Sequence, residues 1–332
     1  MVTTLPSRTR ILDDAFAEVW ELIRAETIDN ILTATPVWAL LQDAGVFTKQ
    51  VGGNTISRTI KHGKVTSTAV AKGDTLSQGE PELETVAFWT PRNIAVHVQR
   101  DLLDDVANAG AYKIKDYVKK RLDDAIQSLK EKYEADLFGT IVLLETGKEI
   151  QGLDDMIPLD DANGKPGSTG TATYGKIDRN NDWWQPVYKA LTANPEVNLL
   201  SDMKNIYNTI SAHRLDATPT NIVMTQTHFE IYEEFALDQS QIIKDESTRL
   251  ADLGFEVLRF KGKPVMWSAN QTASQMLFLN TRFIEVVFDP NLWFHMTNFK
   301  DIPLMTRRIA HILSRCNVIS TQLRNQGRLG HD

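Results

Sequence analysis

A single apolar stripe places the strongest constraint on how this chain folds. Between residues 111 and 138, hydrophobic side chains recur at steps of three or four, and the stripe consists of Ile114, Val118, Leu122, Ile126, Leu129, Tyr133 and Leu137. This spacing predicts one continuous α-helix with an apolar face. At about 1.5 Å per residue the helix would be roughly 40 Å long, with Gly139 as its C-terminal cap. Such a long helix indicates a protein that reaches outward to a substrate, a nucleic acid or another copy of itself.

A β-hairpin is expected immediately before this helix. Gly52-Gly53 breaks the preceding pattern, residues 55–60 read as one strand, and residues 83–90 and 93–99 read as returning strands. Turn signals lie between them, at His62-Gly63 among others. A two-stranded excursion is marginally stable in water by itself. The hairpin therefore needs a surface to lie on, either its own body or a neighbouring molecule.

The rest of the chain reads as a mixture of helices and strands. The N-terminal 50 residues contain two apolar stretches, at 11–24 with helical spacing and at 28–41. Later segments are predicted as a helix over 199–215, a strand over 221–225, a helix over 227–236, and strands over 255–260, 264–268, 275–279, 284–288, 292–296 and 310–323. The expected fold class is α+β.

Composition and charge exclude several classes of protein. Of the 332 residues, 42% are hydrophobic, which is enough for a substantial core, and the net charge is −7. An acidic balance argues against a duplex-DNA binder, whose affinity comes mainly from lysine and arginine. The single cysteine, Cys316, precludes an internal disulfide and a cysteine-based metal site. No apolar run is long enough to span a membrane and no signal peptide is present, which predicts a soluble protein.

The motifs for catalysis and ligand binding are absent or weak. The loop at 164–170 contains glycine, lysine and threonine, but its spacing is not that of a phosphate-binding loop. The seven histidines lack the spacing of a helical zinc site. Paired aspartates at 154–155 and 160–161 leave open a weak cation site. No catalytic residue, cofactor-binding residue or metal ligand is predicted, and no cofactor is expected.

Trp183-Trp184 is the most unusual local pair. Two adjacent tryptophans are costly to expose, because each buries 150–250 Å² when it is covered. The favoured interpretation is that the pair fills a core. The alternative is an aromatic anchor at an interface, where tryptophan is enriched.

Five segments, taken in order, resemble the major capsid protein of tailed bacteriophages with the Hong Kong 97-type fold. The first, Val98-Gln-Arg-Asp-Leu-Leu-Asp-Asp105, is similar to the family's acidic di-leucine segment, with Gln99 where relatives commonly have serine. The others are Tyr133-Glu-Ala-Asp-Leu-Phe-Gly139 at the helix end, Gly152-Leu-Asp-Asp-Met-Ile157, Tyr174-Gly-Lys-Ile-Asp-Arg179 with the tryptophan pair, and Phe260-Lys-Gly-Lys-Pro-Val-Met-Trp-Ser268. The resemblance covers essentially the whole chain.

The resemblance implies a division of the chain into named parts. Residues 1–50 would be an N-terminal arm and 51–92 an extended hairpin loop that lies across an adjacent subunit. Residues 93–151 would begin a peripheral domain, with the helix at 111–138 as its spine packed on a peripheral β-sheet. Residues 152–280 would form a mixed axial domain, and 281–332 would return to the peripheral domain as C-terminal strands.

The resemblance also implies a function. The chain would assemble into hexamers and pentamers of an icosahedral shell that encloses double-stranded DNA without binding it specifically. A portal protein and a separate scaffolding protein would be partners, no membrane would be involved, and assembly into virion capsids would take place in the cytoplasm of the host bacterium. The residues expected at subunit contacts are Arg58, Lys61, Lys64, Lys72, Glu80, Glu82, Trp89, Trp183 and Trp184.

The chain departs from the family's pattern at one point, and other functions remain as alternatives. Some relatives crosslink subunits through a hairpin lysine, an asparagine and a catalytic glutamate, and no matching asparagine and glutamate are found here, which predicts no crosslinking. An encapsulin-type compartment shell has the same fold and is the nearest alternative. Two other classes are an enzyme with a site around Asp154, Asp155, Asp178 and His213, and a nucleic-acid binder that uses the lysines of the long helix. The main prediction is a structural protein and not an enzyme.

Overall fold

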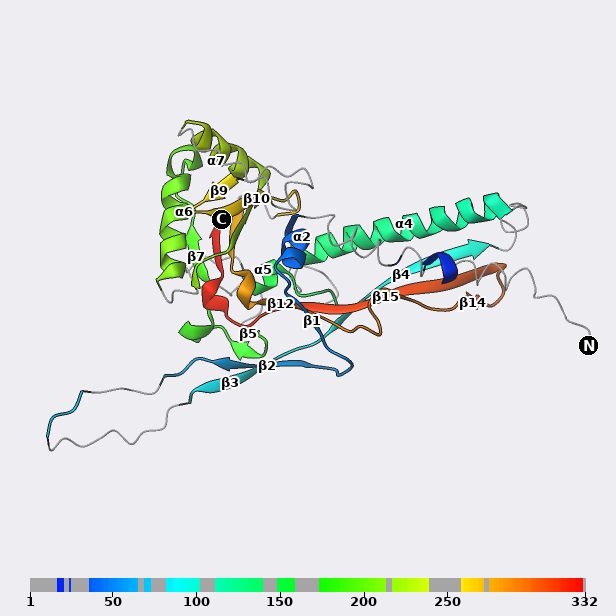
Figure 1. The fold of residues 1–332 in the computed structure, drawn as a ribbon, viewed down its shortest axis with the longest axis horizontal. Helices are drawn as coiled ribbons and strands as arrows, with labels where there is room; N and C mark the ends of the chain where they lie inside the picture. The colour runs from blue at the N-terminus through cyan, green and yellow to red at the C-terminus, as the bar shows by residue number, and fades with distance from the viewer. Residues whose placement is uncertain are drawn as a thin grey trace, which may run out of the picture.

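The computed structural model describes residues 17–20, 24, 36–64, 69–72, 82–101, 111–139, 148–158, 173–212, 217–238, 258–271 and 275–330. They form an elongated α+β molecule (Figure 1). A long helix lies along an extended sheet in one part, and a second, more compact sheet carries two helices in the other. No helix within these ranges is long and apolar enough to cross a membrane.

The first sheet is organised around one long strand. Strand β15 (Arg307–Ser320) pairs antiparallel with β4 (Arg92–Asp101) over ten residue pairs, from Arg307↔Asp101 to Cys316↔Arg92. Its C-terminal half also pairs antiparallel with β12 (Ile284–Phe288). Short strands complete the sheet: β1 (Phe47–Lys49), parallel to β12, and β13 (His295–Met296) and β14 (Lys300–Asp301), both antiparallel to β15.

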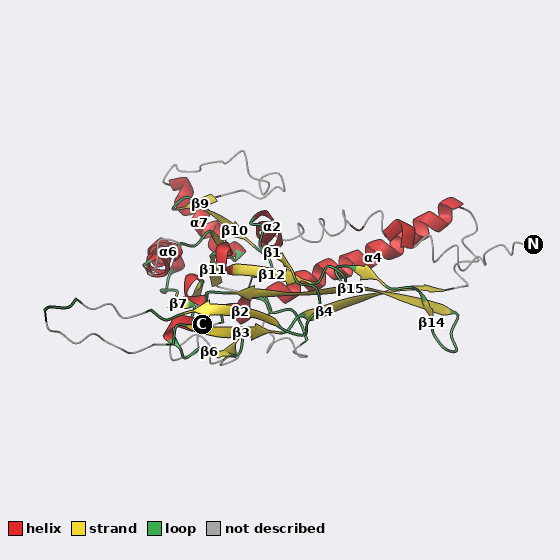
Figure 2. Ribbon diagram, turned by 60° about the horizontal axis from the view of Figure 1, so that its bottom comes forward, coloured by secondary structure: helices red, strands yellow, loops and turns green. Residues whose placement is uncertain are grey.

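The predicted long helix is present as α4 (Ala111–Leu137). Its stripe faces the core, where Leu122, Leu129, Tyr133 and Leu137 are buried. Figure 2 shows α4 running beside β4 and β15. The side chains of Ile114 and Val118, like those of the lysines at 113, 115 and 119, lie outside the described residues.

Tyr133 joins α4 to the sheet and to a second helix. Its hydroxyl forms hydrogen bonds with the Ser314 hydroxyl and, at 3.6 Å, with the Cys316 sulfur. Trp38, from α2 (Pro36–Asp43), donates through Nε1 to the Tyr133 carbonyl at 3.2 Å. Burial raises the pKa of the Cys316 thiol to about 12, so Cys316 behaves as a small buried hydrophobic residue, as expected.

The second sheet has the strand order β7-β16-β11-β8-β10-β9. Its strands are β7 (Val187–Ala190), β8 (Asn221–Met224), β9 (Leu258–Phe260), β10 (Lys263–Trp267), β11 (Gln275–Leu279) and β16 (Gly327–Gly330). Helices α6 (Pro195–Ser211) and α7 (Gln226–Asp238) pack beside it (Figure 1). The buried face of α6 consists of Leu199, Met203, Ile206, Tyr207 and Ile210.

The chain does not end in the first sheet. Residues 327–330 form β16, which pairs with β11 and β7 of the second sheet, so the C-terminal strands expected in one domain are divided between two sheets. Arg328 on this strand is buried and forms an ion pair with buried Asp154 of α5 (Leu153–Met156). Burial lowers the pKa of Arg328 to about 9. A Cβ on Gly327 would lie 2.5 Å from Cδ1 of Ile210, so a larger residue there would require the Ile210 side chain to shift.

Several helices and strands of the structure begin or end at other residues than the sequence predicts. Helix α6 begins four residues earlier than predicted because Pro195 starts it, a position where proline is favoured. The strand expected over 292–296 is confined to β13. Only residues 17–20 and 24 of the helix predicted at 11–24 are described, and they are helical. The short strands β5 (Thr173–Tyr174) and β6 (Ile177–Asp178) were not predicted.

Gly152 offers a test of how α4 and α5 fit together. A Cβ there would lie 2.4 Å from the carbonyl oxygens of Asp136 and Gly139, at the end of α4. Its φ of −88° suits any residue, so only space is at issue. We expect Gly152→Ala to lower the free energy of unfolding by about 1–3 kcal/mol, the usual cost of overpacking. Urea unfolding of unassembled subunits measures this.

Gly45→Ala is the matched control. Gly45 has a left-handed φ of 65°, and no atom lies within 4 Å of its added Cβ. This variant should cost only the strain of that conformation, about 1–2 kcal/mol. A Gly152→Ala protein as stable as the parent would show that α4 and α5 are not held at this spacing.

Candidate subunit-contact surface

The root of the predicted hairpin is formed by two strands. Strand β2 (Ile56–Lys61) pairs antiparallel with β3 (Glu84–Trp89), from Ile56↔Trp89 to Lys61↔Glu84. One face of this ribbon is buried against the rest of the chain through Ile56, Ile60, Ala87 and Trp89. The period-2 alternation of a half-buried strand explains this arrangement. The hairpin root therefore lies on its own subunit.

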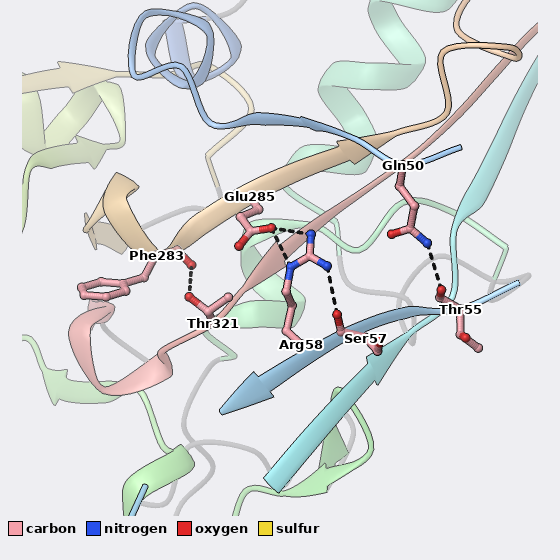
Figure 3. Close-up of polar contacts among 7 residues, drawn as sticks. All are labelled: Gln50, Thr55, Ser57, Arg58, Phe283, Glu285 and Thr321. Atoms are coloured by element: carbon pink, nitrogen blue, oxygen red, sulfur yellow. Dashed lines mark hydrogen bonds and ion pairs between the residues drawn. The ribbon is translucent and has the colours of Figure 1, made fainter. Parts of the chain in front are cut away.

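Arg58 fixes the orientation of the root. Its Nε and Nη2 donate to the Glu285 carboxylate of β12 at 2.9 and 2.8 Å, and its Nη1 donates to the Ser57 carbonyl at 2.9 Å (Figure 3). Both side chains of the ion pair are 27% exposed. A pair this accessible to water contributes at most about 1 kcal/mol. Its role is geometric, because the forked guanidinium allows few orientations.

Trp89 attaches the root to the small β5–β6 ribbon. Its ring meets that of Tyr174 edge-on, with centroids 5.7 Å apart. The backbone N–H of Phe88 donates to the Gly175 carbonyl at 2.9 Å. Gly175 has a φ of 60°, and a Cβ there would lie 2.8 Å from the Trp89 ring. Glycine is therefore required at this turn for both conformation and space.

The opposite face of the ribbon is open and partly apolar. Phe88 is 39% exposed and Val86 is 43% exposed, and the register places Ser57 and Thr59 beside them. Lys176 lies 5.9 Å from the centre of the Phe88 ring. Val86 and Phe88 therefore form a small exposed apolar patch on this face of the ribbon.

The tryptophan pair divides into two roles. Trp184 is fully buried in η1 (Asp182–Trp184), and its Nε1 donates to the Tyr174 carbonyl at 2.9 Å. Trp183 is half-buried, and His62 stacks on it with ring centroids 4.0 Å apart and an interplanar angle of 14°. Trp184 therefore packs in the subunit core, as the favoured interpretation had it, whereas Trp183 supports the point where the hairpin leaves β2.

A groove of about 660 Å³ opens beside this stack. Its walls come from the end of β2 and the residues after it, from Trp183 and Trp184, and from the turn that contains η4 (Leu323–Asn325). Lys61, Lys64 and Arg324 line it together with His62. The groove thus brings together residues that lie far apart in the sequence.

The predicted contact residues fall into different environments. Lys61, Lys64, Lys72 and Glu82 are exposed, whereas Glu80 lies outside the described residues. Trp89 and Trp184 are buried within the subunit, Trp183 is half-buried, and Arg58 is engaged with Glu285. The structure brings Lys61, Lys64, Trp183 and Trp184 to one groove.

Sequence reasoning missed several residues of this surface. His62 was read only as part of a turn, and Arg324 had no role assigned. The alternation of β3 could have revealed Val86 and Phe88 as its outward face. No pattern in the sequence signals that His62 and Trp183 stack, because only the tertiary fold brings them together.

The two buried aspartates considered for an enzyme site, Asp154 and Asp155, are engaged by other side chains. Asp154 is paired with Arg328, and Asp155 accepts a hydrogen bond from Gln151 Nε2 at 3.0 Å. Burial raises the pKa of Asp155. Asp178 is exposed, and His213 and the 160–161 aspartate pair lie outside the described residues. Within the described ranges no group of three or more acidic, histidine or cysteine side chains is placed to hold a metal.

Comparison with solved structures identifies the fold. The cyanophage A-1(L) capsid asymmetric unit contains a chain that matches with a TM-score of 0.64 at 15% identity, over 88% of this chain and 91% of that one. The chain has the fold of phage capsid proteins. The capsid of a native GTA particle matches with a TM-score of 0.54 at 12% identity, covering 88% of this chain and 89% of the other.

An encapsulin shares the same fold. The SrpI encapsulin of Synechococcus elongatus PCC 7942 matches with a TM-score of 0.52 at 12% identity, over 86% of this chain and 84% of that one. No family model matches the sequence, and comparison with curated proteins gave no match. The likeness to capsid proteins is therefore one of fold, and it extends over most of the chain.

The two tryptophans should respond differently to truncation. Trp184→Ala removes a fully buried ring, and we expect it to lower the free energy of unfolding by about 3–5 kcal/mol. Trp183→Ala removes a half-buried stacking partner, and we expect a loss of about 1–2 kcal/mol. Urea unfolding of the two variants measures both. Equal losses would contradict the division of the pair into a core residue and a support for the hairpin.

Proposed function

We propose that this chain is the major capsid protein of a tailed bacteriophage. The observation that carries the proposal is the match of nearly the whole chain to a phage capsid chain, at a TM-score of 0.64. The subunits assemble into hexamers and pentamers of an icosahedral shell around double-stranded DNA.

The parts of a Hong Kong 97-type subunit can be assigned on this basis. Helix α4 is the spine helix of the peripheral domain, and the first sheet is the peripheral sheet. The second sheet with α6 and α7 is the core of the axial domain, to which β16 also belongs. Residues 51–92 are the extended hairpin loop, rooted on its own subunit through β2 and β3 and reaching a neighbour beyond them.

The proposed partners follow from the same assignment. The shell would meet a portal protein at one vertex and a separate scaffolding protein during assembly, in the cytoplasm of a host bacterium. Packaged DNA would be held without specific contacts, because the chain has a net charge of −7. Contacts spread over several neighbours allow moderate individual affinities to add up to a stable shell.

An encapsulin-type shell that encloses a protein cargo is the second candidate, favoured by the match at a TM-score of 0.52. The encapsulin assignment would be supported if the assembled shells recruit a cargo protein through a short peptide. Shells that package DNA through a portal would support the capsid assignment.

Assembly can be tested directly by negative-stain electron microscopy of the expressed chain, alone and with a candidate scaffolding protein. We expect closed shells or capsomers. A chain that stays monomeric at high concentration in both cases would refute the proposal.

Phe88→Asp should keep a folded subunit but reduce shell formation, since it places a charge on the open face of β3. Phe88→Tyr, which retains the ring, is the matched control and should assemble.

A further inference from the structure

We propose that the groove at the hairpin root binds a carboxylate-bearing segment of a second copy of this chain. The inference rests on the proposed shell function and adds a specific contact to it. The groove has room for protruding side chains, with a volume of about 660 Å³. It is also open to a partner that approaches from outside, because Lys61 and Lys64 at its edge are both exposed.

The side chains that line the groove carry one sign of charge, although Glu84 lies opposite Lys61 in the β2–β3 register. Lys61, Lys64 and Arg324 line it, and none of the described residues that line it is acidic. Neither lysine forms an ion pair with a carboxylate within the part of the chain that the structure describes. A concave site lined by one sign of charge attracts the opposite charge. The groove therefore fits an anionic partner.

The walls of the groove are held in place before any partner arrives. His62 stacks on Trp183, and its Nε2 lies 2.9 Å from the Thr85 hydroxyl oxygen. The N–H of Gly63 donates to the Leu83 carbonyl at 3.0 Å, and a Cβ on Gly63 would lie 2.3 Å from the Glu82 carbonyl oxygen. Fixing these residues in advance lowers the entropic cost of binding.

A second copy supplies the anion because the chain as a whole is acidic. It has 43 acidic and 36 basic residues, so a positive groove stands out against its own surface. Helix α7 illustrates such a segment: it carries Glu230, Glu233 and Glu234 and no lysine or arginine. It lies on the side of the molecule away from the β2–β3 ribbon (Figure 1). In a ring of subunits, each contact joins two different surfaces of the same chain.

Carbodiimide crosslinking of assembled shells tests the contact, because it joins a lysine amine to a carboxylate that touches it. Shells are assembled from a mixture of unlabelled and ¹⁵N-labelled subunits, and crosslinked peptides are identified by mass spectrometry. We expect mixed-isotope peptides that join Lys61 or Lys64 to an acidic segment of another copy. Shells in which other lysines crosslink between copies, but these two do not, would overturn the proposal.

Charge reversal provides a second readout. We expect the double variant Lys61→Glu, Lys64→Glu to reduce shell yield at least about tenfold, since a repelled charge pair costs on the order of 1.4 kcal/mol or more. Lys204→Glu, at an exposed position of α6 outside the groove, is the matched control and should assemble nearly as the parent does. Equal losses in both variants would overturn the groove contact.

The two proposals fail in different ways. A parent chain that forms no shells at all would refute the capsid function. The groove contact alone would be refuted if parent shells form but their Lys61 and Lys64 crosslink to no other copy. If packaged DNA is then the only thing that protects these two amines from chemical modification, the groove faces nucleic acid.

Discussion

The antiparallel pairing of β4 with β15 is the interaction on which the rest of the structure depends. Ten residue pairs join residues 92–101, directly after the hairpin, to residues 307–316 near the C-terminus. This ladder closes a long loop that contains α4 and most of the second sheet. Closing such a loop costs chain entropy, and the long run of hydrogen bonds and buried side chains in the ladder offsets that cost. It also forms the platform on which the stripe of α4 is buried. Without it, α4 would lose most of its partners.

Buried polar side chains then connect this platform to the hairpin and to the second sheet. Asn317, fully buried on β15, donates to the Thr90 carbonyl at 3.1 Å and accepts from the Gln151 N–H at 3.0 Å. One side chain thus positions both the end of the hairpin and the entry to α5. The buried pair of Arg328 and Asp154 ties the final strand to the same region. Removing one partner of such a pair is far more costly than replacing both.

The parts of the fold that were predictable have strong local patterns. The stripe of α4 and the apolar runs of Gln275–Leu279 and Ile284–Phe288 appear as predicted, because hydrophobic periodicity and bounding turns suffice for them. Strand β16 was missed because Gly327 and Gly330 have low strand propensity, and pairing on both sides stabilises it instead. Arg58 was predicted at a contact, but its partner Glu285 and the stack of His62 on Trp183 depend on tertiary approach.

We propose that the subunit is a preformed body whose hairpin root stays on its own chain while the region beyond it holds a neighbour. Cryo-electron microscopy of the assembled particle tests this most directly. We expect a closed icosahedral shell in which β2 and β3 remain against β12 of the same subunit and residues 51–92 also contact an adjacent one. A particle in which each hairpin touches only its own subunit, or one without icosahedral order, would contradict it.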